Sequence, residues 1–484
     1  MSISYLFSHD RKQSSVLLWS TWAVFACIVY FLGFSHELWL DEWHVWFMCE
    51  RLSLKQLLLD IASEGHFYPW HLMILPFVKC GMDLWCLKFV SCTLGVLAGW
   101  LVLFKSPFSY GCKVLILLSY PVLYYFPARP RCYALITPLL FGIAALYQQQ
   151  AKHLYLYCFL VGLLAHTHGY MEGFVGALFL LFCYQHIYLP YRQHGQWLKA
   201  VAPASLILIL VLLAYIPVAG KASSDKATID ATTDTSLKFI DKVFNAYSWQ
   251  PSLFVSQLFP SVHIPDVDVI ITITLWAIVT VALYKCLWQS RAAKPLAIAG
   301  FGGIAFICYF ATNIFYISHQ RIYMPYLILL FLLWCTYNPK NRGVVTCLTL
   351  CLFVLTTFDN YRIVAHDAMG YYSNGERVAR CLHDAAPRGS IIAMDNHYGF
   401  IQELVEDNYT AYSFDDHDTE LTDEELDSFF AEHHCTECYP IFYGYNSIDP
   451  HTYNGDKYIM QCLCDGQQDA PLYHVFSLYK IKLK

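Results

Sequence analysis

The chain has 484 residues, of which 57% are hydrophobic and only 14% are charged, and its formal net charge is -6. Soluble globular proteins carry about 25% charged residues, so this composition excludes an ordinary soluble enzyme and indicates a polytopic membrane protein. The acidic balance gives no support for nucleic-acid binding.

The first apolar segment, residues 16–34, is long enough to cross a bilayer and lacks a small-residue cleavage site, so we expect a retained signal anchor. Similar runs follow near residues 84–104, 114–127, 132–148, 153–166, 170–189, 199–218, 266–288, 295–316, 322–337 and 343–358. The sequence therefore predicts a mainly α fold over residues 1–358, a polytopic transmembrane helix bundle of about 11 spans plus interfacial helices.

The orientation of these spans depends on residues 67–78, an apolar stretch of about a dozen residues that is short for a span. If this stretch does not cross, the basic residues of the short loops all lie on one side, as the positive-inside rule requires. They are Arg11, Lys12, Lys105, Lys113, Lys152, Arg192, Lys199, Arg291, Lys294, Lys340 and Arg342. We therefore expect an interfacial or re-entrant helix at 67–78.

The loops on the opposite, outward side carry several distinct features. Ser53 and Gln56 have the spacing of a capping box, and leucines at helical spacing follow, which predicts an amphipathic helix on the membrane surface. The loop 219–265 is mostly polar and fits a mobile lid or an inert connector equally well.

The tail at residues 359–484 is more polar and predicts a small outward-facing α/β domain, periplasmic or lumenal. Strands are expected at 390–394, 441–445 and 474–481, and helices at 375–384 and from Thr422 through Phe430. The acidic run of this second helix indicates a solvated face; it comprises Asp423, Glu424, Glu425 and Asp427.

Most of the 19 cysteines lie in apolar runs, where they act as small hydrophobic residues. The polar tail holds a separate group: Cys435, Cys438, Cys462 and Cys464. These cysteines suit disulfides or a zinc site, and we favour disulfides because the second pair lacks zinc-like spacing.

Asp41 and Glu42 follow the first span, among Trp39, Trp43 and Trp46. Paired carboxylates at a membrane surface are costly to place in apolar surroundings. They suit accepting a proton from an acceptor hydroxyl or helping to hold a divalent cation; the alternative is a pair of solvated loop acids.

Cations and histidines gather on the same outward side. Arg129, Arg131 and Arg321 are suited to clamping a phosphate, although arginines at an interface also extend to the headgroups without a ligand. His66 suits a hydrogen bond to phosphate or carboxylate, or simple exposure. His166 and His168 fit either a metal site or a hydrogen-bonded cluster.

Several motifs in this order resemble the glycosyltransferase C superfamily, in its polyprenyl-phosphate-sugar branch, which includes protein O-mannosyltransferases and the bacterial aminoarabinose transferase. The similarity is best over roughly residues 16–190. The motifs are Leu40-Asp41-Glu42, His66-x-x-Pro69-Trp70-His71, Tyr120-Pro121 through Leu135 with Ala128-Arg129 inside it, His166-Thr167-His168-Gly169, and Arg321-Ile322-Tyr323-Met324-Pro325.

The resemblance implies an inverting transfer of a hexosyl or pentosyl group from a polyprenyl-phosphate sugar donor to a lipid, glycan or protein acceptor. Asp41 would be the base, with Glu42 in support. The donor phosphate would bind Arg129, Arg131, Arg321 and His66. The substrate pocket would hold Trp43, His44, Glu64, Tyr133, His166, His168 and His319.

Two residues depart from the family pattern: Pro127 stands where the family has an acid before Ala-Arg, and Tyr68 stands in place of the first of the family's paired prolines. No cofactor is implied, and the need for a divalent cation is left open. Two alternatives stand beside the enzyme: a non-catalytic member of the fold that acts in glycan assembly, and a lipid or solute transporter. We expect a multi-pass protein of a bacterial inner membrane rather than of the endoplasmic reticulum.

Overall fold

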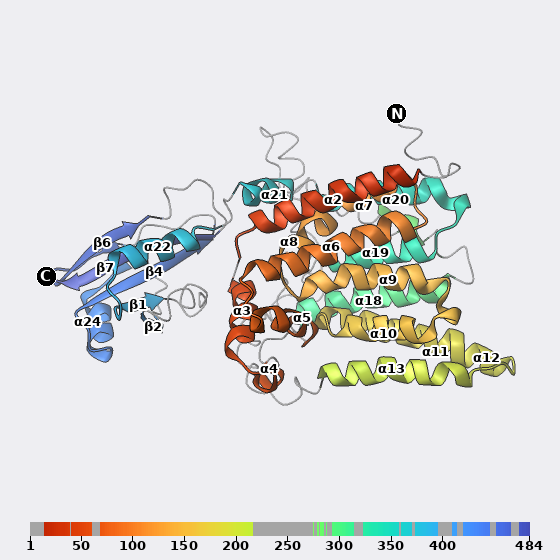
Figure 1. The fold of residues 1–484 in the computed structure, drawn as a ribbon, viewed down its shortest axis with the longest axis horizontal. Coiled ribbons are helices and arrows are strands. Elements are labelled where there is room, and N and C mark those ends of the chain that lie inside the picture. The colour runs from red at the N-terminus through yellow and green to blue at the C-terminus, as the bar shows by residue number, and fades with distance from the viewer. Residues whose placement is uncertain are drawn as a thin grey trace. The chain divides into compact units, whose positions relative to one another are not determined.

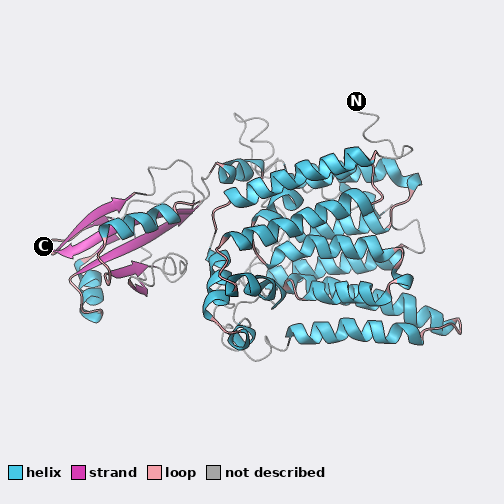
Figure 2. Cartoon of the chain, in the orientation of Figure 1, coloured by secondary structure: helices cyan, strands magenta, loops and turns pink. Residues whose placement is uncertain are grey.

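The computed structural model describes residues 14–38, 40–60, 68–215, 293–313, 323–357, 360–369, 373–394, 409–413, 420–445, 452–465 and 474–484, with a few positions between 274 and 287. The chain divides into two compact units. The membrane unit comprises Met1–Phe34 and Cys49–Arg362, and the C-terminal unit comprises Ser35–Met48 and Ile363–Lys484. The described strands all belong to the C-terminal unit (Figure 2).

Helices of the membrane unit run side by side in Figure 1, where α6 packs on α9, α9 on α10 and α19, and α11 on α18. Their bounds are α2 Ser15–Ser35, α4 Leu54–Asp60, α5 Tyr68–Lys79, α6 Trp85–Lys105, α7 Tyr110–Leu118, α8 Phe126–Ala128, α9 Ile136–Tyr147, α10 Leu154–Ala165, α11 Gly169–Cys183, α12 Leu189–Arg192, α13 Leu198–Tyr215, α18 Lys294–Asn313, α19 Tyr323–Cys335 and α20 Arg342–Thr357. These helices lie where the apolar runs predicted them.

The described helices include three that are long and apolar enough to cross a membrane: Ser15–Ser35, Trp85–Lys105 and the continuous stretch Gly169–Arg192. A fourth results if Tyr110–Leu118 and Pro121–Ala128, bent by 58°, form one span. The other apolar helices are shorter. The helical bundle is therefore confirmed, but the predicted number of spans is not; the run at 266–288 lies almost wholly outside the described residues.

The short elements after α2 follow local sequence signals. The Ser53 backbone N–H donates to Gln56 Oε1 at 3.0 Å and the Gln56 N–H donates to Ser53 Oγ at 3.3 Å, which confirms the capping box that opens α4. The stretch expected at 67–78 is helical as α5, with Pro76 inside it; its interfacial position stays a prediction. The loop 219–265 lies outside the described residues.

The C-terminal unit contains a five-stranded sheet in the order β2-β1-β4-β7-β6. Strand β1 pairs parallel with β2 and β4, whereas β7 pairs antiparallel with β4 and β6. The bounds are β1 Ile391–Met394, β2 Thr410–Ser413, β4 Glu437–Tyr445, β6 Tyr458–Cys464 and β7 His474–Leu483, with a separate parallel pair of β3 Glu420–Leu421 and β5 Thr452–Tyr453. The helices are α3 Leu40–Arg51, α21 Tyr361–Ala368, α22 Gly375–Ala385 and α24 Asp423–Glu432; α3 and α21 extend past the unit's bounds.

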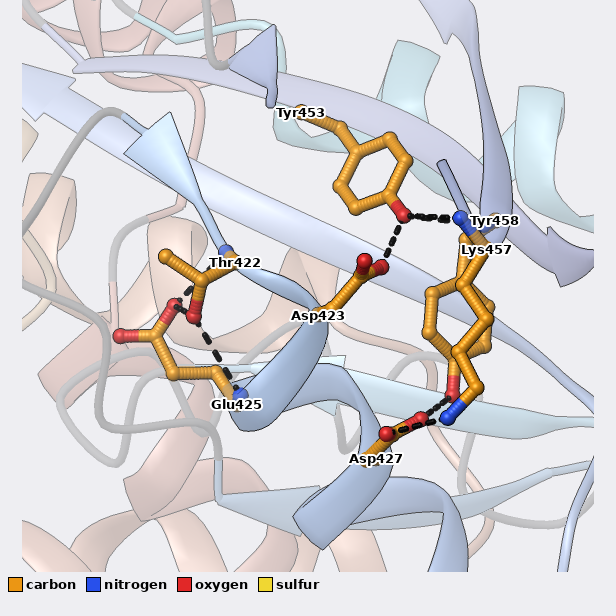
Figure 3. A network of polar contacts seen from close by, with 7 residues as sticks. All are labelled: Thr422, Asp423, Glu425, Asp427, Tyr453, Lys457 and Tyr458. Atoms are coloured by element: carbon orange, nitrogen blue, oxygen red, sulfur yellow. Dashed lines mark hydrogen bonds and ion pairs between the residues drawn. The ribbon is translucent and has the colours of Figure 1, made fainter. Parts of the chain in front are cut away.

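Helix α24 begins at the predicted capping box, in which Thr422 and Glu425 exchange hydrogen bonds (Figure 3). Its acids lie on a solvated face, as predicted: Glu424 and Glu425 are exposed and Asp423 and Asp427 are partly exposed, but two of them also make contacts within the domain. Asp423 accepts a hydrogen bond from the Tyr453 hydroxyl, and Asp427 accepts from the Tyr458 hydroxyl and pairs with Lys457 (Figure 3). These acids attach the helix to strand β5 and to the start of β6.

The C-terminal cysteines are free thiols in the structure, so the favoured disulfides are not present. Cys438 lies on β4 and Cys462 and Cys464 lie on β6, and β7 separates these two strands. Strands two apart are about 10 Å from each other, which is too far for a bridge between them. Sequence patterns missed β6, because its buried and exposed residues do not alternate along the strand.

Candidate active site

One group of candidate residues, in the C-terminal unit, includes a buried charge cluster of Glu42, His36 and Asp367. His36 follows the end of α2, and its Nε2 lies 3.1 Å from Glu42 Oε2. Its Nδ1 lies 2.7 Å from Asp367 Oδ2, on helix α21. All three side chains are almost completely buried. The histidine therefore joins the start of α3 to α21 through a carboxylate at each ring nitrogen.

The protonation of His36 reflects a balance of two effects. Burial lowers its pKa, but the charges of Asp367 and Glu42 and their hydrogen bonds outweigh burial and raise the pKa from 6.5 to about 9. At neutral pH the imidazole is charged and donates from both nitrogens. Glu42 is thus the partner of a buried cation, which suits holding α3 in place.

Asp41 lies at the second position of α3, directly before Glu42; its side chain is not among those described. Trp43 and Trp46 follow and are buried, and Trp43 stacks on Phe47 with ring centroids 5.7 Å apart. His44 is half-buried. The first turn of α3 is therefore anchored by aromatic packing, and carboxylates there are favoured by the helix dipole.

A separate group of candidate residues, in the membrane unit, lies on an irregular segment that carries Arg129. A π-helical turn, Pro121–Tyr125, runs into α8, and α8 ends because Arg129 precedes Pro130 and takes an extended backbone. The Arg131 N–H donates to the Arg129 carbonyl at 2.8 Å and closes a tight turn around Pro130. Prolines thus break the regular helix where the candidate arginines lie.

Aromatic rings surround Arg129. Its guanidinium carbon lies 5.0 Å from the ring centroid of Tyr125 and 5.9 Å from that of Tyr124. Tyr323, at the start of α19, lies 5.1 Å from Tyr125 and 5.2 Å from Tyr120 between ring centroids. We call these five residues the Arg129 cluster. A guanidinium beside aromatic rings is held in position by cation–π attraction, and its planar fork matches the geometry of phosphate oxygens.

Helix α6 fixes the backbone of this segment. The Ser91 hydroxyl donates to the Arg129 carbonyl at 3.4 Å, and the Cys92 thiol donates to the Pro127 carbonyl at 3.7 Å. Gly95 packs directly against the Pro127 ring. Pro127, where an acid was expected from the family pattern, therefore serves close packing between α6 and α8.

His168 caps the next helix and meets Tyr133. The backbone N–H of Tyr170 donates to His168 Nδ1 at 3.2 Å, so a neutral ring carries its proton on Nε2. The rings of His168 and Tyr133 are 5.1 Å apart. His166 and Arg131 are also buried. The hydrogen bond to Nδ1 and the contact with Tyr133 fix the orientation of the His168 ring.

The predicted site residues divide into three sets. Glu42, Trp43 and His44 belong to the C-terminal unit, and Arg129, Arg131, Tyr133, His166 and His168 belong to the membrane unit. Glu64, His66, His319 and Arg321 lie outside the described residues. Sequence patterns missed His36, Asp367 and the tyrosines around Arg129. Within the described part of the chain, no group of three or more His, Cys, Asp or Glu residues is arranged to hold a metal ion.

Comparison with known proteins gives a match at the level of the fold. No family model and no curated protein matches the sequence. The crystal structure of ArnT from Cupriavidus metallidurans bound to undecaprenyl phosphate is similar at a TM-score of 0.51 and 10% identity, covering 96% of this chain and 98% of that chain. The apo structure of ArnT gives 0.53 at the same identity and coverage. The chain therefore has the fold of ArnT, and its apolar helices are those of an integral membrane protein.

Proposed function

We propose that the protein is a membrane glycosyltransferase that moves a hexosyl or pentosyl group from a polyprenyl-phosphate donor to a lipid, glycan or protein acceptor. The observation that carries the proposal is the ArnT fold over 96% of the chain, because one of the two ArnT structures is bound to undecaprenyl phosphate. The Arg129 cluster supports it, since it holds a guanidinium beside an irregular backbone segment in a membrane protein.

In the proposed reaction the acceptor oxygen attacks the anomeric carbon and the bond from that carbon to the phosphate oxygen breaks, with inversion. The lipid phosphate leaves with an added negative charge. Arg129 and Arg131 stabilise this charge, because preorganised cations act most strongly where charge develops. Arg321 and His66 are proposed to contact the same phosphate.

Asp41 is the proposed base that takes the proton of the acceptor hydroxyl. Glu42 supports it by fixing the first turn of α3 through His36, to which it lies at 3.1 Å. The remaining residues proposed to line the substrate pocket are Trp43, His44, Glu64, Tyr133, His166, His168 and His319. The proposal leaves open whether a divalent cation assists.

We further propose that the shorter apolar helices also cross the membrane, giving about 11 spans in total. We also propose that the transfer chemistry and the C-terminal unit lie on the non-cytoplasmic side, which the positive-inside pattern supports, and that the membrane is a bacterial inner membrane.

The test is sugar transfer by purified protein in proteoliposomes that contain a radiolabelled undecaprenyl-phosphate sugar and a membrane extract as the source of acceptor. Asp41→Asn should lower the transfer rate by about 10²–10⁴-fold, the usual contribution of a general base. Donor binding should persist, because Asp41 is not proposed to hold the phosphate.

The matched control is Glu50→Gln, which removes an exposed acid from the same helix and should leave transfer unchanged. Equal transfer by Asp41→Asn and Glu50→Gln would remove Asp41 as the base. Donor binding by the wild type without transfer to any acceptor would favour the non-catalytic alternative.

A further inference from the structure

A polar cavity of about 680 Å³ lies at the opposite end of α19 from the Arg129 cluster. Helix α19 begins at Tyr323, in the cluster, and ends at Cys335, which lines the cavity. The other walls come from the end of α9, from Gln150 and Ala151, from the π-helical turn Tyr184–Tyr188, from the start of α18 and from the turn Pro339–Asn341. None of the residues assigned to the transfer reaction lines it.

Two buried polar atoms at this cavity lack a hydrogen-bond partner in the structure. The Gln150 side chain is only 9% exposed, and its Nε2 donates to Gln185 Oε1 at 3.0 Å. Gln185 in turn donates to the Tyr147 hydroxyl at 3.1 Å. This chain of hydrogen bonds fixes the Gln150 side chain and leaves its Oε1 buried without a donor. His186 Nε2 is the second buried atom without a hydrogen-bond partner. An unpaired buried acceptor is costly, so it indicates a ligand.

The helix beside the cavity has an irregular backbone. The span Gly169–Arg192 is continuous, yet it contains the π-helical turn that carries Gln185 and His186. Such turns are rare and are frequent at functional sites. Another π-helical turn, Pro121–Tyr125, supplies Tyr124 and Tyr125 to the Arg129 cluster. A π-helical turn therefore occurs both at the Arg129 cluster and at the cavity.

The remaining wall supplies positive charge. Lys340 lines the cavity from a turn whose Asn338 side chain accepts the Lys340 backbone N–H at 3.0 Å. Ala293 and Leu296 bring the N-terminus of the 20-residue helix α18 to the cavity, and the unpaired N–H groups of a helix start favour anions. A ligand that pairs with Lys340 and the start of α18 is an anion, and a ligand that also pairs with Gln150 Oε1 carries a hydrogen-bond donor.

We propose that this cavity binds a phosphate ester that also bears a hydroxyl or ammonium group, the chemistry of a glycerophospholipid headgroup. Exposed tyrosines on the adjoining helix, Tyr184, Tyr188 and Tyr191, are typical of the membrane interface. Basic pockets between membrane helices bind anionic headgroups in this way. A soluble phosphate ester has the same chemistry, and the two sources are separated by experiment.

The experiment is native mass spectrometry of the delipidated protein in detergent, titrated with phosphatidylglycerol and, separately, with glycerol 3-phosphate. Wild-type protein should retain one phosphatidylglycerol. Lys340→Gln should weaken this binding about tenfold or more, because a charge-assisted bond is lost. Lys152→Gln, an exposed lysine near the cavity, and Arg129→Gln should bind as the wild type.

A second pair of measurements isolates Gln150. Phosphatidylmethanol lacks the headgroup hydroxyl, so the wild type should prefer phosphatidylglycerol, and Gln150→Leu should lose that preference. Comparable binding of glycerol 3-phosphate supports the site and assigns it to a soluble ligand. Binding that is the same in Lys340→Gln and the wild type, or absent for both compounds, overturns the proposal.

Discussion

At the scale of single residues, His36 is the side chain on which the position of α3 depends. It holds two carboxylates from helices far apart in the sequence, at 3.1 Å and 2.7 Å. Replacing one partner of a buried ionic network leaves uncompensated charge and is strongly destabilising. Glu42 was predictable as a polar residue beside the first span, whereas Asp367 was not, because 331 residues separate it from His36.

The pKa of His36 predicts how stability varies with pH. Its folded pKa, about 9, lies above the ordinary value of 6.5, so its contribution is complete below pH 6.5 and is lost as the pH rises through 9. The melting temperature of the wild type in detergent should therefore fall between pH 6.5 and 9. His36→Gln should be less stable by roughly 3–5 kcal/mol near neutral pH and lack this fall.

The control for this prediction is His153→Gln, an exposed histidine that precedes α10. It should keep both the stability and the pH dependence of the wild type. Parallel pH profiles for His36→Gln and the wild type would show that the cluster is not charged as described.

At the scale of elements, the contact between α6 and α8 sets the backbone of Arg129. A Cβ at Gly95 would overlap the Pro127 ring. The same face of α6 offers the Ser91 hydroxyl to the Arg129 carbonyl. Glycine is thus required here by the close approach of two elements, and any added volume moves the segment that carries the arginine.

Gly95→Ala should therefore destabilise the protein by about 1–3 kcal/mol, the usual cost of overpacking, and weaken binding of undecaprenyl phosphate. Gly176→Ala is the matched control, since no described atom lies within 4 Å of an added Cβ there; alanine should stabilise that helix by up to about 1 kcal/mol. Melting temperature and lipid titration measure both effects. Equal behaviour of the two variants would contradict the close contact.

Elements differed in how well the sequence predicted them. The runs at 153–166 and 343–358 correspond to α10 and α20, and both capping boxes formed, because run length and cap spacing are local properties. Strand β6 was missed because its buried and exposed residues do not alternate, and a bulge between Cys462 and Cys464 interrupts its register with β7. The arginines of the candidate site were predictable as cations in an apolar context. Tyr120 and Tyr323 stood in the motifs, but their contact around Arg129 was not predictable, because about 200 residues separate them.

At the scale of the whole molecule, the division into units does not follow the order of the chain. Residues 35–48 belong to the same unit as the C-terminal sheet although they follow the first span. If the first span crosses the membrane, residues 35–48 leave it on the side opposite the N-terminus, so the side proposed for the C-terminal unit depends on the direction of that helix. The basic residues of the short loops favour the cytoplasmic side and are the basis for the proposed direction.

This orientation is tested with alkaline phosphatase fusions in a bacterial host, since the enzyme is active only outside the cytoplasm. A fusion after Lys484 should be active, because the C-terminal unit is predicted to lie outside. A fusion after Gln193, beside the basic residue Arg192 at the end of α12, should be inactive, and fusions to green fluorescent protein should give the opposite pattern. Activity after Gln193 would mean that α5 crosses the membrane as an additional span, which would move the Arg129 cluster to the cytoplasmic side.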